Sequence, residues 1–173
     1  LLLAGAAGWY FSQKPKKLAS SNTPDMDFYI DDPGVIHKIF MADKSGAEPV
    51  TLERKEDHWI YNGKYKARQT AVNLLLDMFK RVRVKYIMAN VAEPHAVKSL
   101  ATHGIKVELY DEKDNLLKSY YLGGMTNDER GTYMIMEGAK TPYVAFMPGW
   151  EGNLRARFEK PHPDNWRDKA IFE

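Results

Sequence analysis

The sequence predicts an α+β fold: a mostly antiparallel β-sheet with two mid-chain helices, preceded by an N-terminal transmembrane helix. Three observations predict it. About eight short segments have the alternation or the β-branched and aromatic content of strands. Two segments near the middle have helical spacing instead, and an apolar run opens the chain. Because the strand patterns occur in blocks rather than alternating singly with helices, we expect an antiparallel sheet that carries its helices on one side.

The first block should contain four strands. Residues 28–30 form a short apolar segment before an Asp-Asp-Pro-Gly turn, and residues 35–41 alternate between the two faces of a strand. Residues 49–53 and 58–61 flank a polar turn, and the Asn-Gly pair that follows is a strong turn signal.

The two helices are predicted by apolar spacing and by end signals. Residues 67–81 place Val72, Leu75 and Phe79 on one helical face. Residues 82–87 then alternate as a strand does. A shorter helix over residues 93–103 has a proline in its first turn and Gly104 after its last, which is the usual asymmetry of helix ends.

The second block should be entirely β. Residues 105–110 and 116–122 alternate around a polar turn and predict a hairpin. Residues 123–131 are predicted to be a polar loop. Residues 132–137 and 143–147 predict a second hairpin.

An apolar run of eleven residues at positions 1–11 indicates a membrane anchor. At about 1.5 Å per residue it covers roughly half of a hydrocarbon core of about 30 Å, so we expect the helix to begin upstream. Small residues four apart allow close helix approach, and aromatic residues mark the interface with water. The predicted anchor residues are Leu1, Leu2, Leu3, Ala4, Gly8, Trp9, Tyr10 and Phe11.

A signal peptide is the alternative interpretation of this run, because its apolar region is also short and ends in small residues. Lysines follow the run at positions 14, 16 and 17, and the positive-inside rule would place them in the cytoplasm. Residues upstream would outweigh them if they carried more positive charge. The residues alone therefore leave the orientation open.

Composition divides the chain into four segments. Residues 1–12 are the anchor and 13–26 a polar tether with two prolines. Residues 27–160 are long enough for one α+β domain with a core of its own. Residues 161–173 are an extension and the candidate start of a further β-rich unit. With a net charge of +2 and interspersed signs, the chain has no signature of nucleic-acid binding.

The sequence contains no motif that is typical of catalysis or metal binding. We therefore predict no catalytic residue, no cofactor and no metal. There is no cysteine, no nucleophile-elbow motif and no phosphate-binding glycine motif. His95 and His103 are roughly 12 Å apart along one helix, too far to share an ion. The acidic tip at residues 127–129 could hold calcium, but an exposed loop is the simpler interpretation.

The aromatic residues are the candidates for an interaction surface, because exposed tyrosines on a sheet favour contact with a partner or a glycan. The alternative is that these tyrosines close the edges of an ordinary core, which is the more frequent arrangement. Consecutive tyrosines on a strand point to opposite faces, so one core cannot bury both. A tryptophan between glycines either fills the core or docks on a neighbour. The candidate interaction surface consists of Tyr120, Tyr121, Tyr133 and Trp150.

A family resemblance covers about three quarters of the chain. Its motifs are IHKIFM at 36–41, WIYNGKY at 59–65, VRVKY at 82–86, GIKVELY at 104–110, YLGG at 121–124, GTYMIMEG at 131–138 and WRDKAIF at 166–172. They resemble a bacterial, membrane-anchored family catalogued as a domain of unknown function, number 4340 in that series. The resemblance implies a domain outside the cytoplasm, sometimes near gliding-type transport components, and it implies no catalytic residue.

The preferred functional hypothesis is a non-catalytic, single-pass membrane protein. Its periplasmic domain would act as an accessory or scaffolding subunit of a larger envelope complex, with membrane lipid and other membrane subunits as partners. No small-molecule substrate is identified. The alternatives are an anchored module that binds cell-wall glycan or peptide, a transport-system auxiliary protein, and an envelope hydrolase whose carboxylates the sequence does not reveal.

Overall fold

The computed structural model describes residues 25–44, 47–87, 93–150, 152–158 and 163–169. Its centre is one sheet with the strand order β4-β3-β2-β1-β6-β7-β8-β9-β5, in which every neighbouring pair is antiparallel. The predicted α+β class is thereby confirmed. The strands are β1 (Lys38–Asp43), β2 (Val50–Arg54), β3 (Trp59–Tyr61), β4 (Tyr65–Lys66), β5 (Arg83–Ile87), β6 (Ile105–Tyr110), β7 (Leu116–Met125), β8 (Thr132–Met136) and β9 (Tyr143–Phe146).

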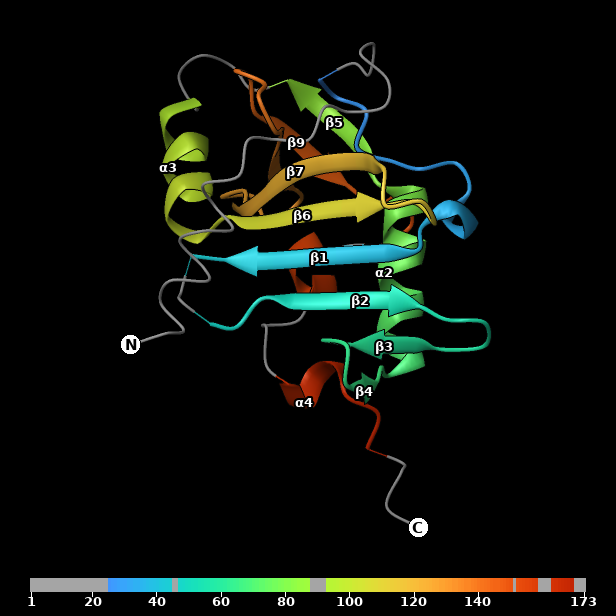
Figure 1. Ribbon diagram of the computed structural model, residues 1–173. Helices are drawn as coiled ribbons and strands as arrows, with labels where there is room; N and C mark the ends of the chain where they lie inside the picture. Colours follow the sequence, from blue (N-terminus) through green and yellow to red (C-terminus); the bar gives the residue numbers. More distant parts are fainter. Residues whose placement is uncertain (1–24, 45–46, 88–92, 151, 159–162, 170–173) are drawn as a thin grey trace.

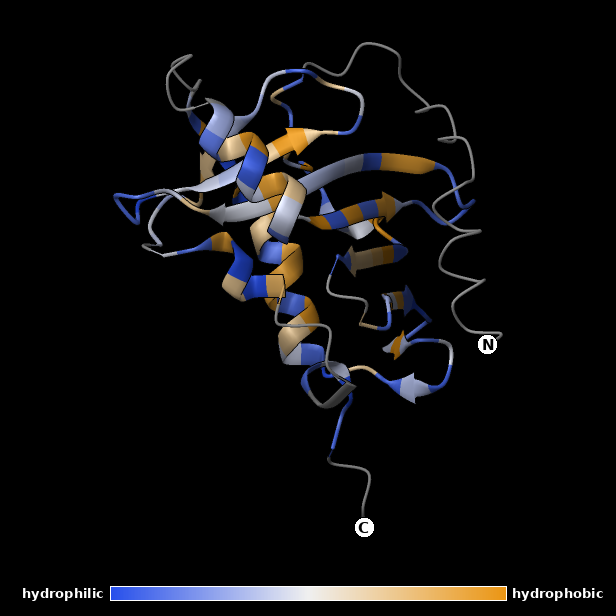
Figure 2. Cartoon of the chain, turned by 90° about the vertical axis from the view of Figure 1, so that its left-hand side faces the viewer, coloured by the Kyte–Doolittle hydropathy of each residue, from blue (hydrophilic) through white to orange (hydrophobic). Residues whose placement is uncertain are grey.

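Helix α2 (Gln69–Arg81) covers one face of this sheet and runs across its strands (Figure 1). Figure 2 shows hydrophobic and hydrophilic residues alternating along it, as an amphipathic helix requires. Val72, Leu75 and Phe79 have no exposed surface and belong to the main core. Each such side chain contributes about 1.5–3 kcal/mol through burial.

Helix α3 (Glu93–His103) lies on the opposite face, so the expectation that both helices share one side is wrong. Its Ala96 and Leu100 pack with Tyr133 and Val144 in a cluster separate from the main core. The neighbouring Met134 points the other way, into the main core. The physical reason is that β8 and β9 carry apolar residues on both faces, and each face needs a cover.

Two strand predictions need correction at the N-terminal side. Residues 28–30 are extended but form no strand, because Ile30 donates its backbone N–H to the Phe79 carbonyl at the end of α2 (2.8 Å). Residues 33–35 form a short 3-10 helix, η1 (Pro33–Val35), capped by the Asp32 carboxylate, so β1 begins only at Lys38.

The predicted loop at 123–131 starts too early, because β7 continues through both glycines to Met125. A Cβ on Gly123 would lie 3.1 Å from Leu100, and one on Gly124 would lie 2.8 Å from the Ser99 hydroxyl. That hydroxyl instead accepts the Gly124 N–H at 2.9 Å. These glycines therefore permit the close approach of α3 to a strand rather than a turn.

The described part of the predicted C-terminal extension packs on the domain. Helix α4 (Pro163–Trp166) places Trp166 in the main core without exposed surface. Asp168 donates its N–H to Lys66 at 2.8 Å, and Ala67 forms a bridge with Arg167. Residues 163–169 thus cover the β4 edge of the sheet rather than leading away from it. The 3-10 helix η2 (Leu154–Phe158) packs on α2 through Phe158 and Phe79, whose rings lie 6.1 Å apart.

Candidate functional site

The four aromatic residues predicted to form one interaction surface do not lie together. Tyr120 has no exposed surface and stacks edge-on against Phe28 in the main core, at 5.8 Å. Its hydroxyl has no hydrogen-bond partner among the described residues, and burial raises its pKa far above the ordinary range. Tyr133 is only 4% exposed and lies beneath α3, 6.0 Å from the ring of His95. Both predictions of an exposed contact residue are therefore wrong.

Tyr121 points to the face opposite Tyr120, as the strand alternation predicts, and borders a polar cluster. We define the outer-face cluster as Lys106, Glu108, Ser119, Tyr121 and Glu137. The Lys106 Nζ lies 2.9 Å from a carboxylate oxygen of each glutamate. The Ser119 hydroxyl donates to Glu137 at 2.6 Å, and the Tyr121 hydroxyl does so at 3.4 Å.

Electrostatics fix the protonation states inside the outer-face cluster. Burial alone would lower the pKa of Lys106, but hydrogen bonds to both glutamates outweigh it and raise the pKa. Burial alone would raise the pKa of Glu137, but hydrogen bonds from Ser119 and Lys106 lower it. The ammonium and the carboxylate therefore stay charged at neutral pH, and the pair supplies neither a free base nor a nucleophile there.

Sequence reasoning missed this cluster, although a signal was present. In the alternating run at 105–110, Lys106 and Glu108 are two residues apart and so share one face of the strand. Glu137 joins them because β8 lies next to β7, a relation between strands that no local pattern records.

Trp150 is half-buried and lines a cleft of about 1040 Å³. We call this the Trp150 cleft. Trp150 packs on the main core and also lines the cleft. Its docking on a neighbour stays a prediction. The lining residues are Lys85, Asp128, Glu129, Arg130, Phe146, Met147, Gly149, Trp150 and Gly152.

A tight turn after β9 holds Trp150 in place. Its backbone N–H donates to the Met147 carbonyl at 3.1 Å, and the two residues form a bridge. Gly149 has a φ of 76° and Gly152 a φ of 143°, values that favour glycine. The Arg157 guanidinium lies 4.6 Å from the centre of the ring. The indole is therefore fixed from the backbone side and by a cation.

The acidic tip at 127–129, considered above for calcium, forms the opposite rim of the Trp150 cleft. The Asp128 carboxylate accepts the Thr126 hydroxyl at 2.6 Å and the Arg130 N–H at 3.2 Å. These hydrogen bonds lower the pKa of Asp128. The carboxylate thus closes its own turn.

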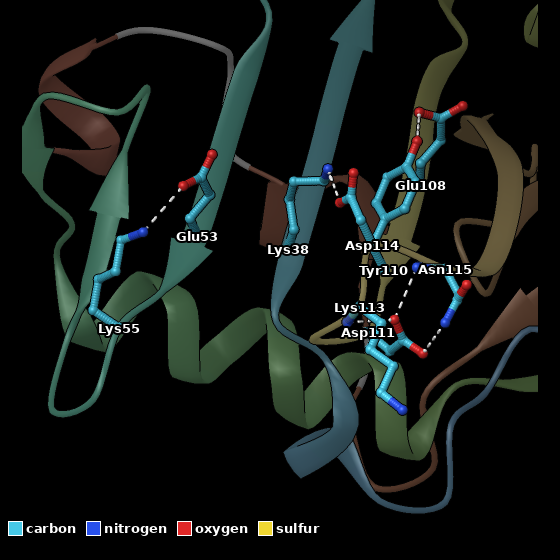
Figure 3. A network of polar contacts seen from close by, with 9 residues as sticks. All are labelled: Lys38, Glu53, Lys55, Glu108, Tyr110, Asp111, Lys113, Asp114 and Asn115. Atoms are coloured by element: carbon cyan, nitrogen blue, oxygen red, sulfur yellow. Dashed lines mark hydrogen bonds and ion pairs between the residues drawn. The ribbon is translucent and has the colours of Figure 1, made fainter.

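A second cleft, of about 930 Å³, lies at the end of the sheet where the β2–β3 and β6–β7 turns meet. Several of its charged residues form local contacts with one another or with neighbouring polar groups (Figure 3). Lys38 pairs with Asp114, and Lys55 with Glu53 at 3.4 Å. The Asp111 carboxylate accepts the backbone and side-chain N–H groups of Asn115, which lowers its pKa. These acids stabilise turns.

The described residues contain neither a candidate metal cluster nor a candidate membrane-spanning helix. In that part of the chain, no three histidine, aspartate or glutamate side chains are grouped so that they could hold a metal ion. None of the described helices is long and apolar enough to cross a membrane. The predicted anchor residues 1–12 lie outside the described residues, so the anchor stays a prediction.

Comparison with known proteins adds no relative. No family model, no curated protein and no solved structure matches this chain. The family resemblance given above therefore remains an expectation from the motifs. The fold and the clefts show that the described residues form an α+β domain with a cleft lined in part by aromatic residues.

Proposed function

We propose that this chain is a non-catalytic accessory or scaffolding subunit of a larger bacterial membrane complex. Residues 1–12 would anchor it in lipid, and the α+β domain would contact other subunits outside the cytoplasm. The apolar run and the family resemblance support the location. The observation that carries the proposal is the edge of the sheet at β5, which pairs on one side only among the described residues.

The two edges of the sheet differ. At β4, the segment 163–169 adds backbone hydrogen bonds and covers the edge. Among the described residues, β5 pairs only with β9. An unpaired edge is a template for a further strand, and proteins normally block it unless a partner uses it.

Tyr86 makes this edge suitable for a partner. It is 44% exposed and lies opposite Val144 in the sheet register. A large amphipathic ring on an edge strand offers apolar area together with a hydroxyl for hydrogen bonding. The irregular register at Lys85 also limits uncontrolled pairing, so a specific partner is favoured over self-aggregation.

A second candidate function is that of an anchored module that binds cell-wall glycan or peptide. The Trp150 cleft is the specific observation that favours it. A transport-system auxiliary role is a particular form of the accessory proposal and predicts the same contact at β5.

Exchange of Tyr86 for arginine tests the accessory role. We expect the wild-type chain, extracted from its native membrane in mild detergent, to migrate in an assembly larger than itself. The Tyr86→Arg variant should lose most of that assembly, by about tenfold or more, because a charge replaces a central aromatic contact. Native electrophoresis with immunodetection measures the ratio of assembled to free chain.

Leu74→Arg is the matched control, since Leu74 is 42% exposed on α2, away from β5. It should leave the assembly intact. A wild-type chain that migrates alone would contradict the proposal. Equal loss in both variants would show that β5 is not the contact.

A further inference from the structure

The Trp150 cleft presents a rigid aromatic surface before any ligand arrives. The turn hydrogen bond and the two glycine conformations set the backbone at Trp150, while Arg157 and the main core contact the indole itself. A Cβ on Gly152 would lie 3.2 Å from the ring, so this position is kept small where the ring lies. Phe146, from the end of β9, adds a second half-buried aromatic side chain to the lining. Binding to such a surface costs little side-chain entropy.

Charged residues of both signs line the cleft. Among the described lining residues, Lys85 and Arg130 are positive and Asp128 and Glu129 are negative. Lys85 donates to the Arg130 carbonyl at 3.1 Å and ties β5 to the opposite rim. A neutral ligand with many hydroxyl groups finds both hydrogen-bond donors and acceptors on this lining.

We infer that the Trp150 cleft binds a neutral saccharide. One face of a sugar ring consists of C–H groups and can lie on the indole, while its hydroxyl groups reach the charged rim. This combination of apolar surface and a few polar groups is that of a ligand site. The inference rests on the second candidate function, the binding of glycan, and names the ligand class of that site. It is independent of the accessory role, because it concerns a different surface and needs no partner protein.

The test uses the purified full chain in detergent with two defined probes, chitotetraose and cellotetraose. Isothermal titration calorimetry should detect binding of at least one of them to the wild-type chain. Trp150→Ala should weaken that binding at least about tenfold, equivalent to roughly 1.4 kcal/mol. Trp150→Phe should retain part of it, because the phenyl ring keeps a stacking surface.

Tyr65→Ala is the matched control, since Tyr65 is a half-buried aromatic residue at the other edge of the sheet. Its affinity should equal that of the wild type. Circular dichroism confirms that each variant is folded. Failure of both sugars to bind at millimolar concentration would overturn the inference, and so would equal affinity in Trp150→Ala. Binding of unstructured peptides but not of sugars would assign the cleft to peptide instead. None of these outcomes depends on whether the membrane assembly exists.

Discussion

Replacement of Trp166 by alanine is expected to lower the free energy of unfolding by about 3–5 kcal/mol, as for other large aromatic residues removed from a core. Trp166 has no exposed surface and belongs to the same core as Leu75 of α2. Its carbonyl also accepts the Arg68 N–H just before that helix, at 2.7 Å. Loss of the indole should therefore weaken the whole domain. Urea unfolding followed by circular dichroism measures the change.

Two comparisons make this result interpretable. Leu75→Ala should cost about 2–5 kcal/mol in the same cooperative transition. Trp150→Ala should cost less, because Trp150 is only half-buried. An unchanged midpoint for Trp166→Ala would mean that residues 163–169 form a separate unit, as the sequence suggested.

Replacement of Lys106 by methionine is expected to destabilise the domain by about 2–3 kcal/mol at neutral pH. The value is below the roughly 3–5 kcal/mol for removing one partner of a fully buried pair, because the side chains of the pairs keep some exposure. That exposure is 15% for Lys106, 9% for Glu108 and 24% for Glu137. The substitution leaves two neighbouring carboxylates without their shared cation.

The change in the free energy of unfolding on acidification should also have the opposite sign in the Lys106→Met variant. In the wild type, the folded-state pKa of Glu137 lies below its ordinary value of 4.5. Its stabilising contribution is therefore complete above that value and is lost as the pH falls through the folded-state pKa. Without the Lys106 ammonium, burial is the largest influence on Glu137 and is opposed by the hydrogen bonds from Ser119 and Tyr121 alone. The pKa of Glu137 should therefore rise, and acidification from about pH 6 to 4 should stabilise the variant.

Unfolding midpoints in urea at pH 7, 5 and 4 check both parts of this prediction. Lys98→Met, at an exposed position of α3, is the matched control and should behave as the wild type. A Lys106→Met variant that loses stability on acidification in parallel with the wild type would show that the ion pairs do not control the titration of Glu137.

Local patterns predicted most elements well because their information is contained within a few residues. The strand at 105–110 and the helix at 93–103 have the predicted bounds, and the long helix begins two residues later than expected. Alternation also predicted correctly that Tyr120 and Tyr121 face opposite sides of the sheet. Alternation does not show which element packs against each face of the sheet. The prediction that Tyr133 is exposed is wrong because the residues of its own strand give no information about helix α3, which covers it.

The sequence by itself determined the α+β class, the mid-chain helices and the hairpin strands, since periodicity and turn residues act over short distances. Only the tertiary structure decided that the helices take opposite faces, that Trp166 closes the core and that Lys106 lies between two glutamates. Those relations join residues far apart in the chain, and which of many apolar or charged partners meet depends on the packing of the whole sheet. The same packing leaves β5 without a further strand among the described residues and forms the cleft beside Trp150.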